Sequence, residues 1–392
     1  MATLTCLTTQ TSSLIKVSAQ KLLIFTLFIT HFAVGMEVVN SGIVFAGKAA
    51  GENNAAKRFP FSWELAKKNS LNKILADKLS KYNNSNFSIL TDDLGSTKRN
   101  SASLAFVVDF EKYYISKLSG FEKFKLEIFI VAEAMFFDFK TKSILASHPF
   151  IISYSEICDN RPDEAHIRAI FERIYGADAF IVNSQNLNIF DFFIETISNI
   201  NPERVHSSSI GVSKVNILPE TIDNVLKMGF REDEAKEFIA SLFNAYIYKN
   251  FKIPVIPYSY DGSEIFYVMA DGYIESDKLT NQLLLQAPRS TYKIDISLRK
   301  LLSKIAEERR GIRTYFFGAS YLVSVRDIED EVVFNKTIGK GNSAIYIAGE
   351  EKNWPFEAEY IEVLIMLTQS AGERLKTDAK FSGFSEIIEK CR

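Results

Sequence analysis

The sequence has little of several residue types that mark common functional classes. It contains 3 cysteines, 4 histidines and 9 prolines in 392 residues. No Cys-x-x-Cys or His-Glu-x-x-His spacing occurs, so the two commonest metal-binding patterns are missing. No Gly-x-Ser-x-Gly segment and no P-loop occurs either, which removes two frequent signatures of hydrolases and nucleotide-binding proteins. The sequence therefore predicts no catalytic residue, no cofactor-binding residue, no cofactor and no metal ligand.

Charge and hydropathy exclude further classes of protein. The formal net charge is −2, so no general basic field indicates a nucleic-acid partner. Hydrophobic residues make up 47% and charged residues 24% of the chain, which is an ordinary globular mixture. This composition excludes a disordered chain and a membrane protein with many spans.

A hydrophobic segment near the amino terminus indicates export. Lys16 and Lys21 precede an apolar run, and the small residues Ala33 and Gly35 end it. This order is typical of a secretory signal peptide, and the run is shorter than the ~20 residues of a membrane-spanning helix. We expect residues 1–35 to be a signal peptide cleaved near Gly35 and Met36. Two alternatives stay open: residues 21–35 remain as a membrane anchor, or translation begins at Met36 and the protein is a cytosolic binding protein.

Two cysteines remain once the signal segment is removed. Cys158 and Cys391 either form one disulfide in an oxidising compartment or stay as two free thiols.

Hydrophobic periodicity predicts an α+β or α/β fold with two similar mixed-sheet units. We expect a first α/β domain at 36–176, a helical connection at 177–250, a second α/β domain at 251–382 and a tail at 383–392. The expected strands are 42–46, 103–110, 125–139, 143–150, 211–215, 253–260, 264–270, 291–297, 314–325 and 332–337. The expected helices are 63–79, 163–175, 219–229, 232–248 and 355–372, several of which begin after proline and end at glycine.

The two halves resemble each other in the order of their elements. At an offset of about 190 residues, the strand 103–110 meets 291–297 and the hairpin 129–150 meets 315–337. The helix after Pro162 meets the helix after Pro355. This pattern predicts an internal repeat in which helices pack on both sheets.

Aromatic residues are abundant, with 32 Phe and 16 Tyr. Phe136, Phe137 and Phe139, like residues 315–317, occupy both faces of their expected strands. Such runs are typical of strands covered on both sides. The alternative is an exposed aromatic edge that binds a partner or a bilayer surface.

Two hairpins carry a resemblance to known envelope proteins. Their tips are Phe137-Asp-Phe-Lys-Thr-Lys-Ser-Ile-Leu145 and Val325-Arg-Asp-Ile-Glu-Asp-Glu-Val-Val333, and a helix follows each one. With the export signal, this order resembles the curli secretion-channel family and the TolB amino-terminal-like domains of bacterial envelope accessory proteins. The resemblance implies an exported, periplasmic or envelope-associated scaffold or assembly factor without enzymatic activity. It would act near the membrane through contacts with a protein partner or with itself.

An exported enzyme of unfamiliar type is the second hypothesis. It requires a pocket around His148 and Asp138, into which Glu133 and Asp109 also converge with displaced pKa values.

Overall fold

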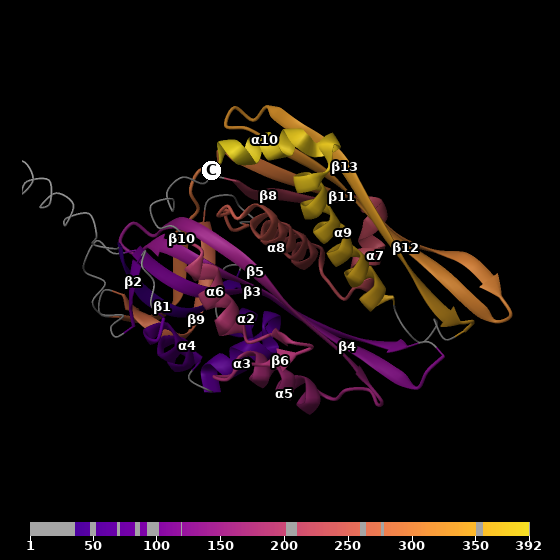
Figure 1. The fold of residues 1–392 in the computed structure, drawn as a ribbon, viewed down its shortest axis with the longest axis horizontal. Coiled ribbons are helices and arrows are strands. Elements are labelled where there is room, and N and C mark those ends of the chain that lie inside the picture. The colour runs from indigo at the N-terminus through magenta and orange to yellow at the C-terminus, as the bar shows by residue number, and fades with distance from the viewer. Residues whose placement is uncertain are drawn as a thin grey trace, which may run out of the picture.

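The computed structural model describes residues 36–47, 52–68, 71–82, 87–91, 102–118, 120–200, 210–258, 264–275, 278–349 and 356–391. They form two sheets with packed helices, which confirms the predicted mixed α/β class (Figure 1). The predicted signal segment, residues 1–35, lies outside the described residues. No helix in the described part of the chain is long and apolar enough to cross a membrane.

The larger sheet has seven strands in the order β2-β1-β3-β4-β5-β10-β9. Strand β1 runs parallel to β2 and β3, whereas β3, β4 and β5 are successive antiparallel neighbours. The bounds are β1 Met36–Gly47, β2 Phe87–Leu90, β3 Ala102–Leu118, β4 Lys123–Asp138, β5 Ser143–Cys158, β9 Glu264–Glu275 and β10 Lys278–Gln286. The predicted hairpin of the first half is therefore confirmed as β4 and β5.

This sheet closes on itself because one side of β1 pairs with two strands. Met36–Val39 pair with β2, and Val44–Gly47 pair antiparallel with β9. Strand β10 reaches β5 at the pair Gln286 and Ser143. Strands β1, β3, β4, β5, β10 and β9 thus form a ring, whose interior is filled by apolar side chains that include Val44, Val107, Phe137, Tyr267 and Leu285.

Helices α2 to α6 cover the opposite face of the larger sheet (Figure 1). Their bounds are α2 Glu52–Arg58, α3 Pro60–Lys68, α4 Leu71–Ser80, α5 Glu164–Ile174 and α6 Ile189–Ser198. The predicted start of α5 is confirmed, because the Asp163 side chain accepts a hydrogen bond from the His166 backbone N–H at 2.8 Å. A short hairpin, β6 Ile181–Val182 and β7 Gln185–Asn186, lies between α5 and α6.

The smaller sheet has four strands in the order β13-β12-β11-β8. Its strands are β8 Ile210–Ile217, β11 Tyr292–Arg309, β12 Ile312–Arg326 and β13 Val332–Ile347. Its helices are α7 Pro219–Lys227, α8 Glu232–Phe251, α9 Glu357–Thr377 and α10 Ser382–Lys390, with a 3-10 turn at Ala379–Phe381. The buried residues of these helices share one core with the inner face of the sheet.

Helix α8 lies between the two sheets and contacts both β5 and β8 (Figure 1). Because it is covered on several sides, its buried residues extend around the helix, from Phe238 and Ile239 to Tyr246 and Ile247. Asn244, also buried, accepts a hydrogen bond from the Val212 backbone N–H and donates to the Ile256 carbonyl, at 3.1 Å each. One polar side chain thus ties α8 to the edge of the smaller sheet.

The two sheets have matching topology. In the first unit, residues 36–200, β1 is followed by α2 to α4, by the strands β2 to β5, and by α5 and α6 with the short hairpin β6–β7 between them. Four of these strands lie side by side in the order β1-β3-β4-β5. In the second unit, described at residues 210–258, 287–349 and 356–391, the strands β8-β11-β12-β13 repeat this order, and β8 is parallel to β11 as β1 is to β3. The hairpin β9–β10, which lies between α8 and β11 in the chain, belongs to the larger sheet. Matching β-bulges place Asp109 of β3 and Arg299 of β11 between paired residues. The topology therefore supports the predicted repeat.

Several segments do not belong to the domain in which the sequence predicted them. The hairpin β9–β10, expected in the second domain, belongs to the larger sheet, and β10 itself was not predicted. Helices α7 and α8, expected in a connection, pack with the smaller sheet. The strand expected at 253–260 is wrong for residues 253–258, because Val255 forms only an isolated bridge to Ser147 there; residues 259–260 lie outside the described residues. The tail expected at 383–392 is mostly the packed helix α10.

The aromatic runs differ in outcome between the sheets. Phe136 and Phe137 are fully buried on opposite faces of β4, which confirms a strand covered on both sides. In the smaller sheet, Tyr315 and Phe317 join the inner core, whereas Phe316 lies on the outer face. A Cβ atom at Gly341 would come within 2.4 Å of the Phe316 ring, so this glycine lets the ring lie against the backbone.

Candidate functional site

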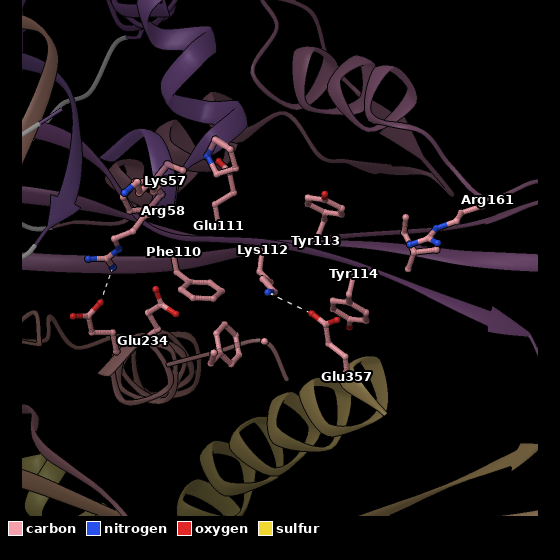
Figure 2. Close-up of a pocket in the computed structure, with 16 residues that line it drawn as sticks. Lys57, Arg58, Phe110, Glu111, Lys112, Tyr113, Tyr114, Arg161, Glu234 and Glu357 are labelled. Atoms are coloured by element: carbon pink, nitrogen blue, oxygen red, sulfur yellow. Dashed lines mark ion pairs between the residues drawn. The ribbon is translucent and has the colours of Figure 1, made fainter. Parts of the chain in front are cut away.

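A polar pocket of about 480 Å³ lies where the two units meet (Figure 2). Strand β3 forms its floor with Phe110, Lys112 and Tyr114. Helix α2 and the start of α3 contribute to one wall, and the first turns of α8 and α9 contribute to the other.

Three glutamates of this pocket lie at the starts of three helices. Glu111 accepts hydrogen bonds from the backbone N–H groups of Phe61 and Ser62 in α3, at 3.1 and 3.0 Å. Glu234 accepts from the Arg231 backbone N–H before α8 at 2.9 Å, and Glu357 begins α9. Carboxylates at helix starts balance the positive end of the helix dipole. These acidic groups therefore have a structural reason to be there.

Two ion pairs cross the pocket and join the units. Arg58 of α2 pairs with Glu237 of α8 at 2.8 Å. Lys112 of β3 pairs with Glu357 of α9 at 3.4 Å, and its ammonium lies 4.9 Å from the centre of the Phe230 ring (Figure 2). In each pair a cation of the first unit thus binds a carboxylate of the second unit.

Two carboxyl groups, the half-buried Asp109 and the buried Glu133, lie behind the pocket, between β3, β4 and α8. The bulge in β3 sends the consecutive side chains Asp109 and Phe110 to the same face of the sheet. Burial raises the pKa of Asp109 to about 6, although its hydrogen bond to Ser241 and the charge of Arg58 lower it. Burial and the neighbouring Asp109 raise the pKa of Glu133 to about 8. Both groups therefore hold protons more tightly than free carboxyl groups do.

Glu111 is another buried carboxyl group, on the opposite face of β3. Burial raises its pKa to about 7 despite the hydrogen bonds from Ser62 and Phe61. Ser62 also donates to Glu111 and lies 2.8 Å from the Tyr175 hydroxyl, so α3 and the end of α5 meet at this group.

The structure brings together only part of the predicted enzymatic pocket. Asp109 and Glu133 interact. Glu133 pairs with Pro149 of β5, so the two side chains share one face of the sheet. His148 precedes Pro149, so its side chain lies on the other face. Asp138 lies at the hairpin tip and accepts from the Lys140 and Thr141 backbone N–H groups at 2.8 and 3.0 Å. A pocket around His148 and Asp138 is therefore not formed.

His148 is buried among aromatic rings. Its ring centre lies 5.2 Å from that of Tyr248 and 6.0 Å from that of Phe136. Neither ring nitrogen has a hydrogen-bond partner among the described residues, and burial lowers the pKa of His148 to about 3. This histidine is neutral at ordinary pH.

Cys158 and Cys391 are free thiols in the structure. Cys391 is buried in the core of the second unit, whereas Cys158 packs against the core of the first unit. The disulfide between them is therefore not formed, and the alternative of two free thiols holds in this structure.

One group of potential metal ligands was not recognised from residue spacing in the sequence. Glu156, Cys158 and His166 place one donor atom each within 4.8 Å of the others at the end of β5. The sequence separates Cys158 from His166 by a turn and the start of α5, so the cluster depends on how the helix packs back. The alternation of Glu156 and Cys158 on one strand face was the only local signal.

Strand β13 forms an exposed edge of the smaller sheet. Strand β13 pairs with β12, and no strand of the described residues pairs with its opposite side. Its first nine residues include Lys336 and Lys340, whereas Gly341–Ile347 contains no charge and no proline. Ile345 and Ile347 are 62% and 45% exposed, and Ile312, which pairs with Ile347, is 49% exposed. An uncharged apolar strand edge is thus open to solvent.

Comparisons with known proteins show no family for this chain, because no protein-family model and no curated protein matches it. A "putative lipoprotein" from Caulobacter crescentus CB15 superposes with a TM-score of 0.19 at 10% identity, over 26% of this chain and 72% of its own. A minor lipoprotein from Acinetobacter baumannii superposes with a TM-score of 0.23 at 6% identity, over 44% of this chain and 92% of its own. Neither superposition is close enough to bear on the fold or function of this chain.

Proposed function

We propose that this protein is an exported scaffold or assembly factor of the bacterial cell envelope, which binds a protein partner and has no enzymatic activity of its own. The partner adds a strand to the free edge of β13 at Gly341–Tyr346. The hydrophobic segment at residues 21–35 supports export, and the smaller sheet presents the edge.

The open edge carries this proposal. Natural proteins protect a free edge with lysine, proline or a covering element, because its unpaired N–H and C=O groups recruit other strands. Lys336 and Lys340 give this protection to the first nine residues of β13, and the residues after Lys340 lack it. Strand addition uses backbone hydrogen bonds for affinity and alternate side chains for specificity. Ile345 and Ile347 are alternate residues and would supply that specificity.

The arrangement of charges also favours a scaffold. Arg58–Glu237 and Lys112–Glu357 link the two units, and the glutamates of the polar pocket cap helices. These charged groups therefore bind one another and stabilise the fold, which is the role expected in a scaffold.

The exported enzyme keeps one observation in its favour, the pair Asp109 and Glu133 with raised pKa values. Neither residue lines the polar pocket or the second cavity, a space of about 500 Å³ between β5, α6 and α8. The pair therefore lies outside both of these cavities, and we favour the scaffold.

The test compares the wild-type chain with Ile345→Lys in native size and in partner capture from envelope extracts. A lysine at the edge opposes strand addition, so we expect the variant to lose the partner or the self-association of the wild type. The matched control is Ile328→Lys, because Ile328 is also exposed, at 69%, but lies in the turn before β13.

Two results would contradict the proposal. One is a wild-type protein that is monomeric and captures no partner. The other is equal capture by the wild type and Ile345→Lys. Cell fractionation and the mass of the mature amino terminus test export separately, and a cytosolic protein that begins at Met36 would reject that part.

A further inference from the structure

We propose that Glu156, Cys158 and His166 form a binding site for a divalent transition-metal ion, zinc above all. This site is independent of the edge of β13 and does not rest on the proposed scaffold function.

The fold assembles three different donor groups at this place. Glu156 and Cys158 are alternate residues of β5, so both side chains project from the same face of the strand. The chain then turns through Pro162, and α5 begins at Glu164. Because the Asp163 side chain caps α5 at the backbone of His166, the first turn of the helix holds this histidine beside the end of β5.

The donor atoms already lie close together. The Cys158 sulfur is 3.2 Å from Oε1 of Glu156, and Nε2 of His166 contacts the same Oε1 atom. The three donor atoms all lie within 4.8 Å of one another. Zinc bonds of about 2.0–2.3 Å in a tetrahedron need donor atoms roughly 3–4 Å apart, so small side-chain rotations suffice.

A second residue orients the carboxylate. The hydroxyl of Tyr154, two residues before Glu156 on β5, donates to Oε2 of Glu156 at 2.5 Å. This hydrogen bond occupies the far oxygen and leaves Oε1 toward Cys158 and His166. Metal-binding carboxylates are commonly held in this way by an outer partner. Tyr154 is therefore a positioning residue for the site.

The chemistry of the donors selects the ion. A thiolate, an imidazole and a carboxylate suit zinc and its neighbours among the transition metals, whereas calcium and magnesium require oxygen donors. The side chain of His166 is 47% exposed, so an ion can enter from solvent and water can fill a fourth position. A bound ion would fasten the start of α5 to the end of β5.

The experiment titrates the reduced, metal-free full chain with Co²⁺, followed by Zn²⁺. We expect one Co²⁺ per chain, a thiolate-to-cobalt charge-transfer band in the near ultraviolet, and loss of that band when Zn²⁺ displaces Co²⁺. Cys158→Ser should abolish the band, and His166→Gln should weaken binding about tenfold or more. Cys391→Ser is the matched control, since it removes the buried thiol of the other unit and should keep the band.

Circular dichroism shows whether each variant folds. If Cys158→Ser fails to fold, His166→Gln still tests the site, because this variant keeps the Cys158 thiol. Tyr154→Phe should weaken Co²⁺ binding several-fold without removing the band. The proposal is overturned if the wild type shows no charge-transfer band. It is also overturned if Cys391→Ser removes the band, or if His166→Gln binds Co²⁺ as the wild type does.

Discussion

Arg58 of α2 and Glu237 of α8 form a 2.8 Å ion pair that joins the two units beside the half-buried Asp109. Only 19% and 16% of their side chains are exposed, so solvent screens this pair less than it screens a surface pair. The charge of Arg58 also lowers the pKa of Asp109, against the effect of burial. Arg58 thus interacts electrostatically with both Glu237 and Asp109 at the boundary between the units.

Arg58→Ala should therefore destabilise the protein by about 1–3 kcal/mol, because it leaves partly buried negative charge without its partner. The check is the free energy of unfolding from urea titration. Lys68→Ala is the control, since Lys68 pairs with Glu64 on the surface, where such a pair contributes about 0–1 kcal/mol. Equal, small losses in both variants would show that the Arg58 pair does not join the units.

Stability should fall as the pH rises from about 5 to 8. Glu133, with its pKa raised to about 8, keeps its proton in the folded state over a range in which the unfolded chain has lost it. The folded state then binds more protons than the unfolded state, so rising pH favours unfolding. In Glu133→Gln this loss should shrink by at least about 1 kcal/mol, as measured by urea unfolding at pH 5 and pH 8. Identical pH dependence in the variant and the wild type would reject the raised pKa.

At low pH the opposite dependence should come from His148. Its pKa is lowered to about 3, so the folded state excludes a proton that the unfolded chain binds below about pH 6.5. The stability that depends on the neutral ring is therefore lost as the pH falls from about 6.5 toward 3. His148→Leu should resist acid better than the wild type, with a difference that grows from pH 6 to pH 4. Parallel acid unfolding of the two proteins would contradict this expectation.

Gly211 should not tolerate a side chain. A Cβ atom there would lie 2.5 Å from the carbonyl oxygen of Ile256, whose position is held by backbone hydrogen bonding to Ile210 and by Asn244. Gly211→Ala should cost about 1–3 kcal/mol of unfolding free energy through overpacking. Gly47→Ala is the matched control, because this strand glycine has its nearest neighbour at 3.9 Å. A thermal or urea midpoint that falls equally in both variants would contradict the close approach at Ile256.

Local signals predicted much of the fold. The alternation at 291–297 marked the first part of β11, which continues to Arg309, and the charged tips marked both hairpins. Pro219 and Pro162 marked the starts of α7 and α5. The repeat was visible because each unit keeps its order of elements. These features depend on neighbours in the chain, which a sequence displays directly.

Long-range pairing explains what the sequence did not show. Strand β10, Lys278–Gln286, follows β9 in the chain, and the closed ring depends on contacts of this hairpin with β1 and β5, far away in sequence. The convergence of Asp109 with Glu133 required the bulge in β3, and the group of Glu156, Cys158 and His166 required the packing of α5. The predicted pocket at His148 and Asp138 was wrong because strand alternation and the hairpin tip separate them.

A photo-crosslinking residue placed at position 345 of β13 in growing cells tests the central claim most directly. The account predicts a discrete protein adduct at this position, in the envelope fraction, and none from the same residue at position 328. The contrast is informative because Ile345 and Ile328 are both exposed, at 62% and 69%, and only Ile345 lies on the free edge. No adduct at position 345, or equal adducts at both positions, would contradict the claim that a partner strand binds this edge.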